Sequence, residues 1–172
     1  MFDDIQAAIR DVPDFPKKGI LFKDITPLLA NPAHFCRIID ALYQRYQGRQ
    51  IQYVAAVEAR GYLIASALAY RLGAGLIPIR KPGKLPCETI KVSYQLEYGT
   101  DSVEMHRDAI EQGKRVLVLD DVLATGGTAE AAVRLVREAG GVVVEMAFLI
   151  ELGFLNGRKR LADVPMFALL QL

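Results

Sequence analysis

Short, almost purely aliphatic runs alternate along most of this chain with segments in which apolar residues return every third or fourth position. The aliphatic runs suit strands that are buried on both faces of a parallel sheet. These runs cover residues 51–57, 75–79, 116–119, 142–150 and 164–172. The helical periodicity covers 62–72 and 129–139, and 153–161 reads as a short basic helix. The order predicts an α/β fold with a mostly parallel sheet of about five strands flanked by helices.

The first part of the chain departs from this pattern. Residues 2–11 place their apolar side chains on one helical face and predict a short helix. Residues 12–29 contain three prolines and a tight apolar cluster, which predict a fixed, non-helical course. Asn31-Pro32 then combines a capping residue with a proline and predicts the start of a helix that continues to Tyr46. We interpret residues 1–33 as an arm that packs its apolar residues.

Two adjacent carboxylates, Asp120 and Asp121, lie where the strand 116–119 is predicted to end, and a small-residue loop and a helix follow them. The first turn of a helix offers unpaired N–H groups to an anion, and glycine lets the backbone approach a phosphate closely. The carboxylates would repel a phosphate, so we expect them to face sugar hydroxyls or hydrated Mg²⁺. An ordinary strand-to-helix turn is the alternative. The expected phosphate-binding residues are Ala124, Thr125, Gly126, Gly127 and Thr128.

Charged turns also follow two other predicted strands. The strand 51–57 is followed by Glu58-Ala59-Arg60-Gly61, and the strand 75–79 by Arg80-Lys81-Pro82-Gly83-Lys84. Ligands of open α/β sheets bind at the carboxyl ends of the strands, so these turns are expected to share one site with the acidic pair. The alternatives are a surface salt bridge between Arg60 and Glu58 and a solvated basic turn.

Residues 87–108 are polar, alternate weakly and contain few candidates for a hydrophobic core. Long segments of this kind in a compact domain are usually disordered or act as lids over a site.

Composition narrows the classes of function. The 172 residues suit one domain, 1–172, and the net charge of +1 argues against a general nucleic-acid binder. The acidic amphipathic start is unlike a signal peptide, and the longest apolar run, 62–70, is too short to span a bilayer. Cys36 and Cys87 lie far apart and suggest neither a disulfide nor a zinc site. We therefore expect a cytoplasmic protein with no membrane partner.

The thirteen residues VLVLDDVLATGGT, at 116–128, resemble the phosphoribosyl pyrophosphate (PRPP) signature of the type I phosphoribosyltransferase family. The resemblance implies that Asp120 and Asp121 hold the ribose hydroxyls and that the ATGGT loop holds the 5′-phosphate. EARGY, at 58–62, resembles the family's pyrophosphate loop, in which a cis peptide is common. RKPGKLP resembles a loop whose cations surround pyrophosphate, some of them from the other subunit of a homodimer. The pyrophosphate-binding residues implied are Glu58, Ala59, Arg60, Arg80, Lys81 and Lys84, with Arg60 also in a catalytic role.

Two further segments resemble the adenine-using branch of this family. FPKKGILFKDITPLL resembles its N-terminal hood, with Lys18 where a proline is common. This implies that Phe22 stacks on the purine and that the main chain of Leu21 and Lys23 reads the purine edge. Residues 84–108 resemble its flexible catalytic loop, a hairpin lid. In it Glu97 matches the acid/base acting at purine N7, and Tyr98 the aromatic that closes the site.

The resemblance covers nearly the whole chain. It implies transfer of the phosphoribosyl group from PRPP to adenine, with Mg²⁺ bound through PRPP and no direct protein ligand. The implied assembly is a homodimer with a shared active site. One alternative is a transferase for xanthine, hypoxanthine or guanine, against which the hood argues. Another is a PRPP-sensing regulator; such proteins carry a preceding DNA-binding domain, whereas here the hood begins about a dozen residues after Met1.

Overall fold

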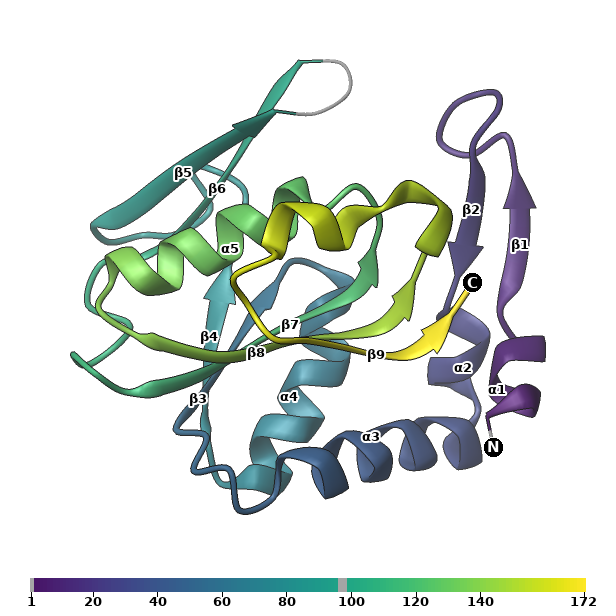
Figure 1. The fold of residues 1–172 in the computed structure, drawn as a ribbon, viewed down its shortest axis with the longest axis horizontal. Coiled ribbons are helices and arrows are strands. Elements are labelled where there is room, and N and C mark those ends of the chain that lie inside the picture. Colours follow the sequence, from purple (N-terminus) through teal and green to yellow (C-terminus); the bar gives the residue numbers. More distant parts are fainter. Residues whose placement is uncertain (1, 96–98) are drawn as a thin grey trace. The chain divides into compact units, whose positions relative to one another are not determined.

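The chain folds into two compact units, Met1–Leu42 and Tyr43–Leu172. The structure is a computed structural model, and it describes residues 2–95 and 99–172. Figure 1 shows the elements in chain order. The helix α3 (Pro32–Tyr46), whose start the Asn31-Pro32 pair predicts, runs from the first unit into the second.

The first unit contains a two-stranded antiparallel sheet that the sequence pattern missed. Helix α1 (Asp3–Ala7) is shorter than the predicted 2–11, because the strand β1 (Arg10–Pro13) begins soon after it. This strand pairs with β2 (Leu21–Asp24), and between them the carboxylate of Asp14 accepts a hydrogen bond of 2.7 Å from the N–H of Gly19. The prolines do exclude a long helix here, and the chain turns back as a hairpin instead.

A short helix, α2 (Thr26–Ala30), lies in the segment predicted to be non-helical. Pro27 is compatible with it because the first turn of a helix needs no N–H from that residue. The side chain of Asp24 accepts hydrogen bonds of 2.9 Å and 2.8 Å from the N–H and hydroxyl of Thr26. That prediction was wrong because a proline count does not show where in a helix a proline lies.

The second unit is built on a five-stranded parallel sheet, as the aliphatic runs predict. Its order is β4-β3-β7-β8-β9, and every neighbouring pair is parallel (Figure 1). Because the strands are parallel, their carboxyl ends lie at one edge. In that order the strands are β4 (Gly75–Ile79), β3 (Tyr53–Val57), β7 (Arg115–Leu123), β8 (Val142–Glu151) and β9 (Met166–Gln171).

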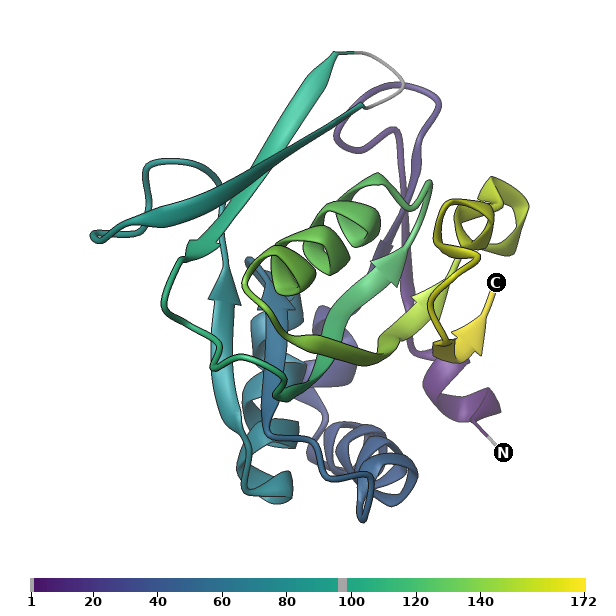
Figure 2. The ribbon, with the colours of Figure 1, turned by 60° about the vertical axis from the view of Figure 1, so that its left-hand side comes forward.

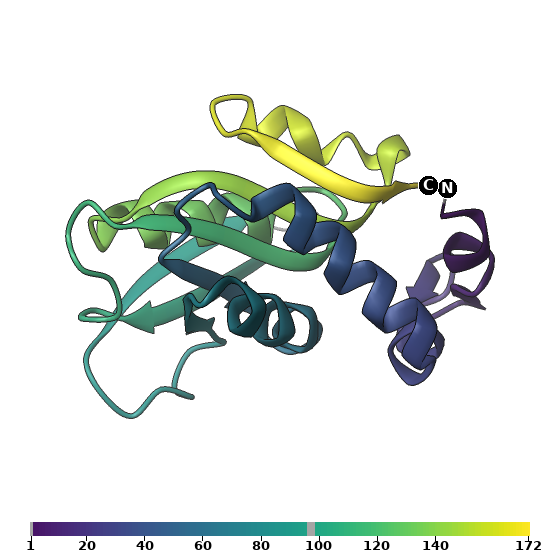
Figure 3. The same ribbon diagram turned by 90° about the horizontal axis from the view of Figure 1, so that it is seen from below.

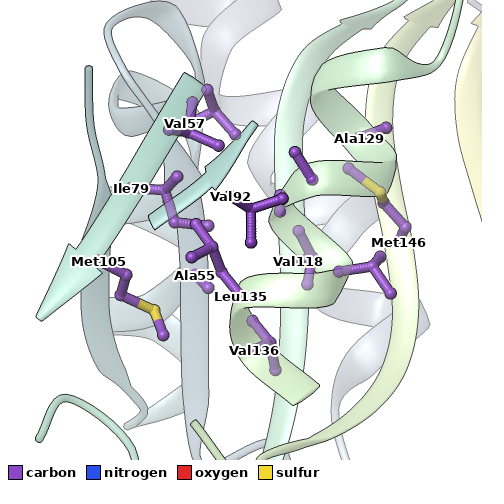
Figure 4. Packing of buried hydrophobic residues seen from close by; sticks show 14 of the residues in the cluster. Ala55, Val57, Ile79, Val92, Met105, Val118, Ala129, Leu135, Val136 and Met146 are labelled. Carbon is purple, nitrogen blue, oxygen red and sulfur yellow. The ribbon is translucent and has the colours of Figure 1, made fainter. Parts of the chain in front are cut away.

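Two helices cover opposite faces of this sheet. Helix α4 (Arg60–Leu72) packs on β3, β4 and β7 and comes forward in Figure 3, whereas α5 (Gly127–Glu138) packs on the other face. Figure 4 shows the core under α5, where Val118 and Leu135 are fully buried. Burying an aliphatic side chain of this size contributes about 1.5–3 kcal/mol, so this core fixes the position of α5 and of the loop that precedes it.

An antiparallel hairpin, β5 (Thr89–Gln95) and β6 (Thr100–His106), lies over α5 (Figure 2). The predicted hairpin within 87–108 is therefore present. The expectation that this segment contributes little to the core was wrong. Its alternation buries one face against α5, with Val92, Tyr94, Val103 and Met105 between 0% and 7% exposed.

Two predicted boundaries differ from the structure. The strand expected at 116–119 continues as β7 to Leu123, and Asp120 pairs with Phe148 of β8. The acidic pair therefore lies within the strand and is held by its ladder. The helix expected at 153–161 is instead two 3₁₀ helices, η1 (Gly153–Leu155) and η2 (Gly157–Leu161), because Asn156 between them has a φ of 54°.

A buried carboxylate anchors the end of α3 to the sheet. Glu145 on β8 is 4% exposed and accepts hydrogen bonds of 2.8 Å and 2.7 Å from Arg45 and of 2.6 Å from the hydroxyl of Tyr46. Burial alone would raise the pKa of Glu145, but these hydrogen bonds outweigh it and lower the pKa.

Replacing this carboxylate is expected to destabilise the fold in a pH-dependent way. Glu145→Gln should lower the free energy of unfolding at pH 7 by about 1.5–3 kcal/mol, the range for hydrogen bonds to charged groups. A carboxylate with a lowered pKa stabilises above its unfolded pKa, so the difference should shrink as the pH falls through the folded pKa. Urea unfolding at pH 7 and below pH 4 measures this, and an undiminished difference in acid would contradict it.

Candidate active site

Three turns meet at the carboxyl edge of the sheet. They follow β4, β3 and β7, which are consecutive in the sheet order. The turn after β7, residues 124–128, leads into α5 and is named the phosphate loop for its predicted role. The turn after β3 leads into α4, and the turn after β4 carries three cations. The sequence prediction that these turns share one edge of the sheet is confirmed by the parallel pairing.

The glycines of the phosphate loop are fixed by tight packing as well as by backbone conformation. Gly126 has a φ of +84°, and a Cβ there would lie 2.6 Å from the carbonyl oxygen of Gly157. Conversely, a Cβ on Gly157 would lie 2.3 Å from the carbonyl oxygen of Ala124. The phosphate loop thus rests directly on the backbone of η2. The bidentate ion pair between Arg158 and Glu151, at 2.6 Å and 2.7 Å, holds η2 against the end of β8.

The other side of the phosphate loop contacts the hairpin. A Cβ on Gly127 would lie 3.0 Å from the ring of Tyr94, so a side chain at this position would push the hairpin away. The hydroxyl of Thr128 donates a 3.1 Å hydrogen bond to the hydroxyl of Tyr94. The loop is therefore held between η2 and β5.

The two carboxylates of β7 form a compact pair beside this loop. The N–H of Asp121 donates a 2.9 Å hydrogen bond to Oδ1 of Asp120, and Nε of Arg60 lies 2.6 Å from Oδ2 of Asp121. A Cβ on Gly61 would lie 3.0 Å from Oδ1 of Asp120, so a larger residue would require the carboxylate or the start of α4 to shift. Burial, and then the charge of Asp121, raise the pKa of Asp120 well above its usual value. A positive charge next to the pair would favour the ionised form of Asp120.

Glu58 organises the cations of the turn after β4. Its carboxylate accepts hydrogen bonds of 2.7 Å from Arg80, 3.1 Å from the N–H of Lys81 and 3.1 Å from Lys84. Burial opposes ionisation of Glu58, but these hydrogen bonds prevail and lower its pKa. The Glu58–Ala59 peptide bond is cis, as the resemblance implied. The carboxylate 2.6 Å from Nε of Arg60 is that of Asp121 rather than that of Glu58. The basic turn is largely exposed to solvent, as the alternative for it expected, but Glu58 holds its cations.

Residues 24–166 match the sequence model of the phosphoribosyl transferase domain. The chain belongs to the phosphoribosyltransferase family. It is 59% identical to an adenine phosphoribosyltransferase of Geobacter metallireducens over 168 residues, which are 98% of each chain. Within the family, a solved adenine phosphoribosyltransferase of Thermoanaerobacter pseudethanolicus superposes with a TM-score of 0.97 at 50% identity over both whole chains. The Saccharomyces cerevisiae enzyme, solved with an imino-altritol bisphosphate and adenine, has a TM-score of 0.92 at 40% identity over 97% of each chain.

Some residues that the family resemblance singles out belong to the first unit or lie outside the described residues. Leu21, Phe22 and Lys23 are in β2 of the first unit, where Phe22 packs edge-on against Phe15 with 5.0 Å between the ring centroids. Their part in binding adenine stays a prediction. Glu97 and Tyr98 lie outside the described residues, and their assigned roles also stay predictions.

Sequence reasoning missed residues that contact the loops of this phosphoribosyltransferase site without belonging to them. Tyr94 and Gly157 contact the phosphate loop, and Glu104, 6% exposed, accepts a 2.9 Å hydrogen bond from the N–H of Gly83 in the basic turn. The alternating pattern of 89–95 was a signal for Tyr94. Nothing in the sequence pointed from Gly157 to the phosphate loop, which lies about thirty residues earlier.

Neither a metal cluster nor a membrane span is found in the part of the chain that the structure describes. No group of three or more His, Cys, Asp or Glu side chains there could hold a metal ion, and none of its helices is long and apolar enough to cross a bilayer.

Proposed function

We propose that this protein transfers the 5-phosphoribosyl group of PRPP to adenine, giving AMP and pyrophosphate. The observation that carries the proposal is the acidic pair, with Asp121 buried, beside a phosphate loop and with the basic turn at the same sheet edge. PRPP presents one group to each of these parts: ribose hydroxyls to the carboxylates, the 5′-phosphate to the loop and pyrophosphate to the basic turn. The full-length similarity to adenine phosphoribosyltransferases supports adenine as the acceptor.

Each part of the site has a role in this reaction. The phosphate loop binds the 5′-phosphate through the N–H groups at the start of α5. Pyrophosphate leaves the anomeric carbon while N9 of adenine attacks it, and positive charge develops on the ribose ring. Asp120 and Asp121 bind the ribose hydroxyls and stabilise that charge, which offsets the cost of burying the two carboxylates. Arg60, Arg80, Lys81 and Lys84 neutralise the departing pyrophosphate.

The proposed reaction uses Mg²⁺ bound together with PRPP. Mg²⁺ is usually held through one or two carboxylates, water and substrate phosphates rather than by a protein cage. The pair Asp120 and Asp121 at the sheet edge would contact such an ion through its waters, with no direct protein ligand. When bound, the ion would neutralise part of the pyrophosphate charge.

Adenine recognition is assigned to the first unit and to the lid. We propose that Phe22 stacks on the purine, and that main-chain groups of Leu21 and Lys23 bind its edge. Stacking on an aromatic side chain contributes about 1–3 kcal/mol per base in nucleic-acid sites. Glu97 serves as the acid/base at N7, and Tyr98 closes over the site.

We also propose a homodimer and a cytoplasmic location. On α4 and the edge strand β4, Leu63 is 50% exposed, Tyr70 88% and Leu76 43%, a set of apolar side chains that a second subunit would cover. The basic turn directly follows β4, so an interface there brings its cations close to the partner's site. Sedimentation velocity would test the dimer, and a monomer at micromolar concentration would contradict it. A cytoplasmic location fits substrates whose charge keeps them from crossing bilayers.

Pyrophosphate release from PRPP and Mg²⁺ tests the function, with adenine, hypoxanthine, guanine and xanthine offered separately. Release with adenine alone is expected. Release with a 6-oxopurine instead would refute the assignment of the hood while leaving the PRPP site intact. PRPP binding without release for any base would favour a PRPP sensor.

A further inference from the structure

A chain of polar contacts joins the basic turn to the phosphate loop through the hairpin. The ammonium of Lys81 contacts Oδ2 of Asp101 on β6, and the hydroxyl of Tyr94 donates a 3.1 Å hydrogen bond to the same oxygen. That hydroxyl also accepts from Thr128 at 3.1 Å and lies 3.5 Å from Nζ of Lys81. A tyrosine hydroxyl has one donor and two acceptor positions, so all three are used here.

The pairing of the two strands fixes this contact. Tyr94 and Asp101 are directly opposite each other in the hairpin register, and Tyr94 is 7% exposed with its ring against Gly127. Oδ1 of Asp101 accepts a 2.8 Å hydrogen bond from the N–H of Ser102. Burial opposes ionisation of Asp101, but the hydrogen bonds from Lys81 and Ser102 lower its pKa, so the contact is an ion pair at neutral pH.

Lys81 differs in this respect from its two basic neighbours. The side chains of Arg80 and Lys84 bind Glu58, which belongs to the adjoining turn at the sheet edge. The side chain of Lys81 instead reaches a carboxylate on the hairpin. A pyrophosphate at Lys81 would bring negative charge next to Asp101, and like charges at such short range repel each other. The anion and Asp101 therefore compete for the same ammonium group.

We propose that Asp101 is a positioning residue that holds the ammonium of Lys81 at the site edge and is exchanged for a pyrophosphate oxygen when the anion binds. The proposal rests on the proposed function, because it takes pyrophosphate as the anion that Lys81 binds. It adds a carboxylate that weakens pyrophosphate binding, and the hydroxyl of Tyr94 contacts both this carboxylate and Thr128.

Removing the competing charge should tighten the binding of a diphosphate. The probe is methylenediphosphonate, an unreactive analogue of pyrophosphate, and its Kd is measured by calorimetry with Mg²⁺ present. In Asp101→Asn we expect the Kd to fall about two- to fivefold, the range that partly exposed ion pairs span. The Kd for AMP, which lacks a pyrophosphate, is expected to stay unchanged.

Two further variants distinguish competition by Asp101 from an effect of net charge and from a purely structural role. Asp108→Asn removes the same charge from an exposed position just beyond β6 and should leave both dissociation constants unchanged. Lys81→Ala should weaken methylenediphosphonate binding, and adding Asp101→Asn to it should produce no tightening. A merely structural Asp101 would instead give a variant that binds both ligands more weakly, which would overturn the proposal.

The outcomes also separate this proposal from the proposed function. If the wild-type protein binds methylenediphosphonate and Asp101→Asn binds it no more tightly, Asp101 is no competitor and the transferase assignment stands. If the wild-type protein binds neither methylenediphosphonate nor PRPP, the proposed function fails, and the proposal for Asp101 fails with it.

Discussion

Asp121→Asn is expected to lower kcat/KM for PRPP by about a hundredfold to a thousandfold, the loss seen when one preorganised electrostatic group is removed from an active site. Asparagine keeps the size of the side chain but removes its charge, so the developing positive charge on the ribose loses a buried partner. Nε of Arg60 would also lose the carboxylate oxygen that lies 2.6 Å from it. Most of the loss should therefore appear in kcat, which steady-state kinetics with saturating adenine measures.

Arg60, the other member of the ion pair, provides the matched comparison for this variant. Arg60→Ala removes the cation and is expected to raise the KM for PRPP and the Kd for pyrophosphate more than the Kd for AMP. Asp121→Asn should thus lower mainly turnover, and Arg60→Ala should weaken mainly the ligands that carry pyrophosphate, although both variants break the same contact. Unchanged turnover in Asp121→Asn, with circular dichroism like that of the wild-type protein, would refute a role at the ribose. Equal losses for PRPP and AMP in Arg60→Ala would contradict its assignment to pyrophosphate.

Gly157→Ala is expected to lower kcat/KM by about a hundredfold, although Gly157 belongs to none of the three turns of the site. Its new Cβ would lie 2.3 Å from the carbonyl oxygen of Ala124, so the phosphate loop must move. Displacements of about 1 Å in a positioned group can cost about a hundredfold in rate. PRPP and AMP share the 5′-phosphate, so the KM for PRPP and the Kd for AMP should both rise. Kinetics and calorimetry measure these two quantities.

The same segment contains a suitable control. Gly153 begins η1, and a Cβ there would meet only the carbonyl oxygen of Leu172, at 3.7 Å. Gly153→Ala should therefore leave AMP binding and turnover within about twofold of wild type, since ordinary surface substitutions have small effects. Because Gly157→Ala should leave the basic turn in place, it should not change the Kd for methylenediphosphonate. A loss of both ligands would indicate that the whole domain had been disturbed.

The parallel sheet could be predicted from the sequence because its strands are buried on both faces and read as unbroken aliphatic runs. The position of residues 124–128 and of the acidic pair at the carboxyl edge could be predicted for a related reason. Their residues are contiguous, so the local order of strand, carboxylates, glycines and helix indicates the anion site. Arg60 and the basic turn followed from the rule that ligands bind where parallel strands end.

The features that could not be predicted depend mainly on contacts between residues far apart in the chain. The ion pair between Arg60 and Asp121 could not be predicted, since Glu58 is nearer to Arg60 in sequence but belongs to a different contact. The hairpin β1–β2 was missed because its strands are short and contain Pro13, which signals irregular structure. The support of the phosphate loop by Gly157 is a backbone contact and leaves no side-chain pattern to detect.

The ion pairs at the carboxyl edge have a consequence for the kinetics of substrate capture. The cations assigned to pyrophosphate each have a carboxylate beside them, from Glu58, Asp101 or Asp121. The field that this edge projects into solvent is therefore small, and long-range steering of a highly charged substrate is weak. Association with PRPP should depend only shallowly on ionic strength, unlike capture by an uncompensated basic cleft. Attraction should develop at short range, where the anion reaches the cations themselves.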